Sequence, residues 1–110
     1  MRRAKIYMQG LPAGVLDEIE YNKQYRFVYD EDYNGEPVSL TMPIEKKEFE
    51  FNTFPPFFDG LLPEGVMLEG LLKQRKIDKD DYFSQLIAVG SDLVGAVTVG
   101  VSDTTSEETA

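Results

Sequence analysis

The first half of the chain alternates between apolar and polar residues with the period of two that is typical of β-strands. Tyr25, Phe27 and Tyr29 share one face of such a segment, and Ile6 and Met8 share one face of an earlier segment. Strands are therefore expected over residues 5–8, 14–21, 25–29, 38–42 and 49–51.

Turn residues separate these predicted strands. A turn is expected at residues 11–14, Leu-Pro-Ala-Gly. Proline fixes the φ angle that a turn requires, and glycine tolerates the backbone conformations at the end of the turn. Residues 30–37 are an expected loop that contains Asn-Gly. Pro43 ends the following strand, since proline cannot donate to a ladder. Asp17 interrupts the alternation of its strand and indicates a bulge or an edge strand.

The apolar period becomes helical after residue 56. A short helical segment is expected over residues 57–62, and a second helix is expected to start at Pro63 and Glu64. Asp78 is the expected N-cap of a last helix that ends at Gly90. A final strand is expected over residues 95–101.

This order of elements predicts an α+β domain. We expect a small, mostly antiparallel, curved and barrel-like sheet, with two or three short helices gathered on one side. One domain is expected over residues 1–101, followed by a disordered acidic tail over residues 102–110.

The composition narrows the possible chemistry. The chain contains no Cys and no His, so it has no thiol nucleophile, no zinc–thiolate site and no neutral-pH acid–base group. We therefore expect no enzyme activity, no metal and no cofactor. The formal net charge of −9 disfavours direct binding to nucleic acid or to an anionic membrane and favours a basic protein partner. Without a signal peptide or membrane span, a soluble cytoplasmic protein is expected.

Two local clusters allow more than one interpretation. Acidic residues gather at 30–32 and 78–81, where carboxylates could act in catalysis or in cation binding, but also suit a turn and a helix start. The structural interpretation is favoured, because neither cluster has the spacing of a calcium loop. Five phenylalanines and two prolines within residues 49–58 form either a core corner or a partner-facing surface.

Several motifs in order resemble the N-terminal subdomain of HipA-type serine/threonine kinase toxins. They are GVL at residues 14–16, VSLTMP at 38–43, FFDGLLPEG at 57–65, DYF at 81–83 and GSDLVGAV at 90–97. The resemblance runs from about residue 5 to residue 101. It implies a domain without phosphotransfer residues, because in this family those residues lie in the kinase core.

The resemblance allows two explanations of the chain. It is either an excised N-terminal subdomain of a longer kinase or a free-standing protein similar to the HipS-type antitoxins of three-gene HipBST systems, and the second is favoured. The implied partner is a HipT-like serine/threonine kinase toxin, which the chain binds and inhibits, with a HipB-like DNA-binding protein as a further partner in a ternary complex. A scaffold that binds without inhibiting is the alternative.

The expected partner contacts lie at the turn and helix start over residues 62–69. They are Leu62, Pro63, Glu64, Gly65, Val66, Met67 and Glu69. Val66 and Met67 are candidate apolar anchors because they follow a turn, although the helical period fits Met67 equally well as a core residue.

Overall fold

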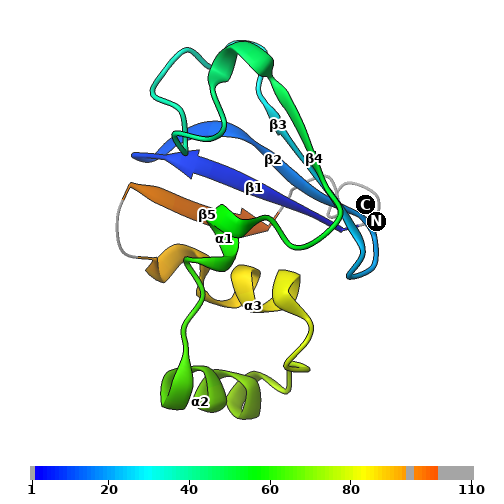
Figure 1. The fold of residues 1–110 in the computed structure, drawn as a ribbon. Helices are drawn as coiled ribbons and strands as arrows, with labels where there is room; N and C mark the ends of the chain where they lie inside the picture. Colours follow the sequence, from blue (N-terminus) through cyan, green and yellow to red (C-terminus); the bar gives the residue numbers. More distant parts are fainter. Residues whose placement is uncertain (1, 94–95, 102–110) are drawn as a thin grey trace, which may run out of the picture.

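A computed structural model of the chain describes residues 2–93 and 96–101. Within these residues the chain forms an α+β domain, which confirms the expected fold class (Figure 1). The strands are β1 (Arg2–Met8), β2 (Leu11–Glu20), β3 (Gln24–Tyr29), β4 (Glu48–Phe51) and β5 (Val97–Val101). The helices are α1 (Pro56–Asp59), α2 (Gly65–Arg75) and α3 (Tyr82–Val89), with single turns η1 (Ile44–Lys46) and η2 (Gly90–Asp92). The predicted tail at 102–110 and the predicted strand start at Gly95 lie outside the described residues.

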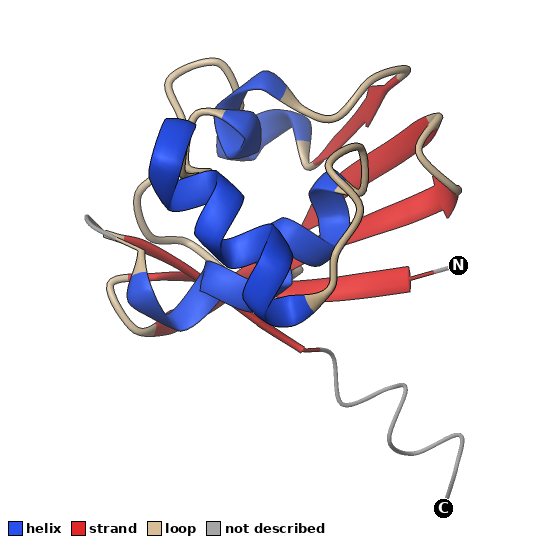
Figure 2. Ribbon diagram, turned by 90° about the horizontal axis from the view of Figure 1, so that it is seen from below, coloured by secondary structure: helices blue, strands red, loops and turns tan. Residues whose placement is uncertain are grey.

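The sheet is open. Its strand order is β4-β3-β2-β1-β5 and every described pairing is antiparallel. β4 and β5 form its two edges, so the described strands do not close into the barrel-like arrangement that was expected. The helices lie on one side of the sheet, as predicted (Figure 2).

The inner face of the sheet carries the core. The paired row of Ala4, Leu16, Phe27 and Phe49 crosses four strands, and all four side chains are buried. Phe27 also meets Tyr29 edge to face, with ring centroids 4.8 Å apart. Burial of each large side chain contributes about 1.5–3 kcal/mol, so this face dominates the stability of the fold.

The phenylalanine-rich run over residues 49–58 is a core corner. Phe49, Phe54 and Phe58 are buried, and the other two phenylalanines pack partly buried against the same core. Phe54 contacts Tyr25 edge to face, with ring centroids 5.3 Å apart. The alternative of a partner-facing surface is therefore not needed to explain this run.

The predicted turn at residues 11–14 is wrong by two positions. The chain reverses at Gln9 and Gly10, whose φ angles are +52° and +82°. A two-residue hairpin turn needs positive φ, which glycine adopts without steric cost. β2 consequently begins at Leu11 and includes Pro12.

Asp17 lies in the central strand of the sheet, so the edge-strand interpretation is wrong. β2 does contain register shifts, but they lie near its two ends. Asp17 is almost completely buried because cations flank it on both neighbouring strands. Arg3 Nε donates a hydrogen bond of 2.6 Å to the carboxylate, and Arg26 Nη2 lies 3.5 Å from it.

No strand forms at residues 38–42, where one was predicted from alternation. The Tyr29 hydroxyl, on β3, donates to the carbonyl of Met42 at 2.6 Å and accepts from the N–H of Val38 at 3.0 Å. These hydrogen bonds hold the segment in a turn, so it does not pair with a strand of the sheet. Val38 and Met42 are buried while Leu40 points outward, so the three do not share one face.

The helix starts differ from the predictions by a few residues. α1 ends at Asp59, and α2 begins at Gly65 with Glu64 as its N-cap, so Pro63 precedes the helix. Asp81 caps α3 in place of Asp78 and accepts a hydrogen bond from the Ser84 N–H. The predicted stop at Gly90 is confirmed, since α3 ends at the preceding residue.

Gly90 and Gly70 give a matched pair of predictions about stability. A Cβ at Gly90 would lie 2.1 Å from the carbonyl oxygen of Val99, whereas a Cβ at Gly70 would meet nothing within 4 Å. Gly90→Ala is expected to lower the free energy of unfolding by about 1–3 kcal/mol or more through overpacking. Gly70→Ala, inside α2, is expected to raise it by about 1 kcal/mol. Urea unfolding measures both, and equal effects of the two substitutions would contradict the close approach at Gly90.

Candidate functional site

Among the α-helices of the described chain, α2 is the least buried. None of its residues is buried, and it lies beyond α3, on the side away from the sheet (Figure 1). Val66 and Met67 are 83% and 76% exposed. The interpretation of Met67 as a core residue is therefore wrong, and both side chains are available to a partner.

The predicted contact residues form one continuous segment at the start of α2. Leu62 and Pro63 are partly buried, whereas five residues are exposed: Glu64, Gly65, Val66, Met67 and Glu69. Gly65 has a φ of +60°, a conformation that favours glycine, and it places the first turn of the helix directly after extended Glu64. The segment is thus fixed by backbone geometry more than by packing.

An open groove of about 670 Å³ runs between the start of α2, the end of α3 and η2. Its apolar walls are formed by Leu61, Pro63, Met67, Leu71, Val89 and Leu93. Met67 connects the groove to the exposed segment. Such a surface, apolar and concave, can accept apolar side chains of another protein.

Gly70 forms part of this groove and was not predicted as a site residue. A glycine inside a helix costs about 1 kcal/mol relative to alanine. Because a Cβ at this position would meet no other described residue within 4 Å, packing in the described fold does not require the glycine. A helix-interior glycine without a packing reason is the one sequence signal that could have indicated the groove.

The charges on α2 are divided between its ends. Glu64 and Glu69 lie in its N-terminal half, and Lys73, Arg75 and Lys76 lie at its C-terminal end. The cations suit the negative end of the helix dipole. A partner on this face would therefore meet an acidic end and a basic end, which favours one orientation of binding.

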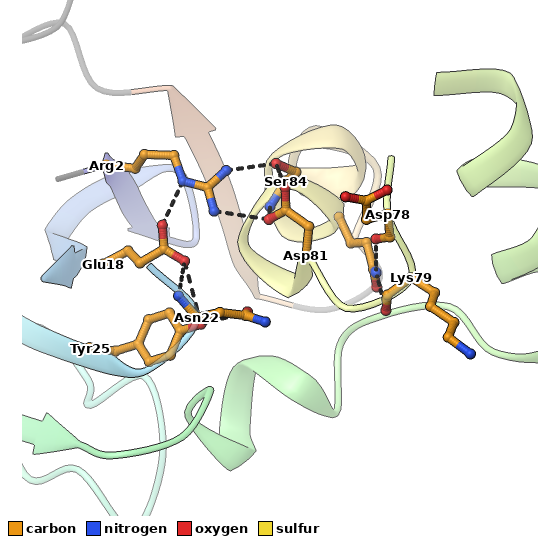
Figure 3. A network of polar contacts seen from close by, with 9 residues as sticks. Arg2, Glu18, Asn22, Tyr25, Asp78, Lys79, Asp81 and Ser84 are labelled. Atoms are coloured by element: carbon orange, nitrogen blue, oxygen red, sulfur yellow. Dashed lines mark hydrogen bonds and ion pairs between the residues drawn. The ribbon is translucent and has the colours of Figure 1, made fainter. Parts of the chain in front are cut away.

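A polar network fixes α3, against which α2 packs, to the sheet (Figure 3). Arg2 donates through Nε to Glu18 at 2.6 Å, through Nη2 to Asp81 at 2.9 Å and through Nη1 to Ser84 at 2.7 Å. Its guanidinium also lies 5.0 Å from the ring centroid of Phe83. One side chain therefore joins β1, β2 and the first turn of α3.

The pKa values in this network reflect the same contacts. Burial by itself raises the pKa of the Asp81 carboxyl, but the hydrogen bonds from Arg2 and Ser84 outweigh it and lower the pKa below its ordinary value. Burial, together with the Glu18 carboxylate, raises the pKa of the Tyr25 hydroxyl to about 12. Asp81 therefore remains ionised and Tyr25 remains neutral at neutral pH, which suits a structural network.

The acidic clusters lie at a turn and at a helix start. In the first cluster, the Asp30 carbonyl accepts from the Tyr33 N–H at 3.1 Å and so closes a turn. In the second, Asp81 caps α3. In the described part of the chain, no group of three or more acidic side chains is arranged to hold a metal ion. No helix among the described residues is long and apolar enough to cross a membrane.

Comparison with known proteins gives one consistent family. The HipA N-terminal domain family model matches residues 4–100. An uncharacterized protein of Haemophilus influenzae is 34% identical, over 90% of this chain and 92% of that protein. The protein named "Putative kinase Y4dM" of Sinorhizobium fredii is 28% identical over 89% of this chain, which spans only 26% of its length.

The solved structures agree with this result. A structure titled "N-terminal domain of HipA toxin" superposes with a TM-score of 0.72 at 31% sequence identity. The match covers 93% of this chain and 93% of that chain. The similarity therefore extends over the whole fold, including the helices that form the groove.

Asp81 gives a prediction about pH dependence. Its folded-state pKa is lowered, so its contribution to stability is present above the unfolded pKa of about 3.9 and is lost as the pH falls through the folded value. Asp81→Asn is expected to reduce the free energy of unfolding by about 1–2 kcal/mol at pH 7, because the ion pair with Arg2 is lost. The difference from the wild type should shrink at pH 3.

Urea unfolding at both pH values measures this effect. Asp80→Asn is the matched control, because Asp80 is exposed and its replacement should change stability by less than about 0.5 kcal/mol. A deficit of Asp81→Asn that stays the same at pH 3 would show that the ionised carboxylate is not its source.

Proposed function

Because this chain belongs to the HipA N-terminal domain family, we propose that it is a HipS-type antitoxin of a type II, HipBST-like toxin–antitoxin system. In this proposal it binds and inhibits a HipT-like serine/threonine kinase toxin and has no catalytic activity itself. The observation that carries the proposal is the exposure of α2, which has no buried residue and presents Val66 and Met67 beside an apolar groove.

The comparisons support action as a separate partner. The Haemophilus influenzae relative consists almost entirely of this domain, whereas in the Sinorhizobium fredii protein the matching region is about a quarter of the length. A domain that occurs in both contexts can supply in trans the contacts that it makes within a longer chain. We propose that the groove and the segment Leu62 to Glu69 make these contacts.

Such a small domain would inhibit the kinase by restricting the movement of its two lobes. Kinases close their lobes over ATP and substrate, and a protein bound across the lobes resists that closure. The net charge of −9 would accelerate the encounter with a basic kinase surface and would disfavour direct contact with nucleic acid. We place the complex in the cytoplasm, where the kinase has access to ATP.

A second candidate function follows from the fused context. The chain spans only 26% of the kinase-named Sinorhizobium fredii protein. It would then act as the N-terminal subdomain of a HipA-type kinase, or as a scaffold that binds a HipB-like DNA-binding protein without inhibiting phosphorylation. The two functions differ in one observable, which is the activity of the kinase in the complex.

The test is the activity of the HipT-like kinase from the same genome, measured with and without this chain at equal concentration. Autophosphorylation and substrate phosphorylation are expected to fall stoichiometrically. The double substitution Val66→Ser, Met67→Ser is expected to weaken binding roughly 10- to 100-fold and to restore activity, because it removes two exposed apolar contacts. Lys23→Ser, at an exposed turn position between β2 and β3, is the control and should inhibit like the wild type.

The outcomes separate the candidates. Full kinase activity in a complex confirmed by size-exclusion chromatography would overturn the antitoxin function and favour the scaffold. Unchanged inhibition by the double variant would move the contact surface away from the start of α2.

A further inference from the structure

Leu40 is the most exposed large apolar side chain in the described part of the chain. It is 97% exposed, although leucine is among the residues most often found in protein cores. Burying a leucine side chain stabilises a fold, and this fold gives up that stabilisation at Leu40. A single exposed leucine on a loose loop would need no explanation, but this one is held in place.

The turn that carries Leu40 is anchored on both sides. The buried neighbours Val38 and Met42 insert into the core, and the Tyr29 hydroxyl hydrogen-bonds the backbone of both. The Tyr29 ring is itself stacked on Tyr33, with centroids 5.8 Å apart and an interplanar angle of 1°. The ends of the turn are therefore fixed by buried residues of the core.

The turn is also closed internally. The Met42 N–H donates to the Ser39 carbonyl at 3.0 Å, and the Thr41 N–H donates to the Ser39 hydroxyl oxygen at 3.2 Å. The Ser39 and Thr41 hydroxyls lie 3.0 Å apart and share a further hydrogen bond. Leu40 thus sits on a turn whose conformation is set before any partner arrives, which lowers the entropy lost on binding.

We propose that Leu40 is the anchor of a second docking point, which inserts into a leucine-sized apolar pocket on the HipT-like kinase. The inference rests on the proposed function and adds a surface to it. In Figure 1 the connection between β3 and β4, which includes Leu40, lies at the end of the molecule opposite α2. The kinase would therefore contact the domain at two separated places, and the two contacts would reinforce each other.

The loop that carries Leu40 is acidic, and this indicates the charge expected at the rim of that pocket. Residues 30–47 contain five acidic residues and two lysines, and four of the acids are exposed: Glu31, Asp32, Glu36 and Glu45. A pocket rimmed by lysine or arginine side chains would match this surface. A basic rim also agrees with the attraction expected from the charge of the whole chain.

The experiment measures the affinity of the purified HipT-like kinase for the full chain by isothermal titration calorimetry. Leu40→Ser is expected to weaken binding roughly 10- to 100-fold. Leu40→Met, which keeps the apolar volume, should stay within about threefold of the wild type. The thermal midpoints of both variants should match the wild type, because the side chain contacts solvent.

The readouts separate this inference from the proposed function. Wild-type affinity for Leu40→Ser would overturn the second docking point and leave the α2 contact standing. Binding without inhibition would overturn the antitoxin function, while the loss of affinity in Leu40→Ser would still support the docking point. A wild-type chain that does not bind the kinase would overturn both. Self-association that Leu40→Ser abolishes would assign the pocket to a second copy of the chain and overturn the inference.

Discussion

The aromatic inner face of the sheet has to be covered, and the rest of the structure follows from how the chain does this. Tyr25, Phe27 and Tyr29 place three large rings in a row on the β3 strand, and all are buried. α1 and α3 supply Phe58, Phe83 and Leu86 to this core. The connection between β3 and β4 covers the remaining end with Val38 and Met42. These segments cover the core without α2. The first turn of α2 and the groove beside it therefore stay exposed to solvent.

A polar network adds direction to the packing of the covering helix α3 on the core. Glu18 and Asp81 are carboxylates on different elements, and Arg2 neutralises both within 2.6–2.9 Å. Because Arg2 and Asp81 are both partly exposed, their ion pair and the hydrogen bond from Arg2 to Ser84 give direction more than energy, and they favour the observed position of α3 over the sheet. Because α3 forms one wall of the groove, the position of α3 also sets the shape of the groove. We therefore expect a change at Arg2, far from the candidate site in sequence, to act on that site through α3.

The exposed apolar residues follow from the same constraint. Val66 and Met67 lie on a helix without core contacts, and Leu40 lies on a turn whose flanking residues are used by the core. A small acidic domain that offers apolar contacts at two ends is suited to holding two parts of one larger partner, since each contact raises the effective concentration of the other. This arrangement agrees with a family domain that is found both as most of a short protein and as one part of a kinase-named protein.

The sequence by itself determined the α+β class, the strands with clean alternation and the helical segments that follow residue 56. It did so because these features depend on local periodicity and turn chemistry. The strand predicted from alternation at residues 38–42 does not form, because the hydroxyl of Tyr29 hydrogen-bonds the backbone of this segment and holds it in a turn. The predicted N-cap Asp78 was wrong, because the cap is Asp81, which Arg2 contacts only once the chain has folded. The groove and the outward position of Leu40 were likewise decided by tertiary structure alone, because each depends on contacts between segments that are distant along the chain.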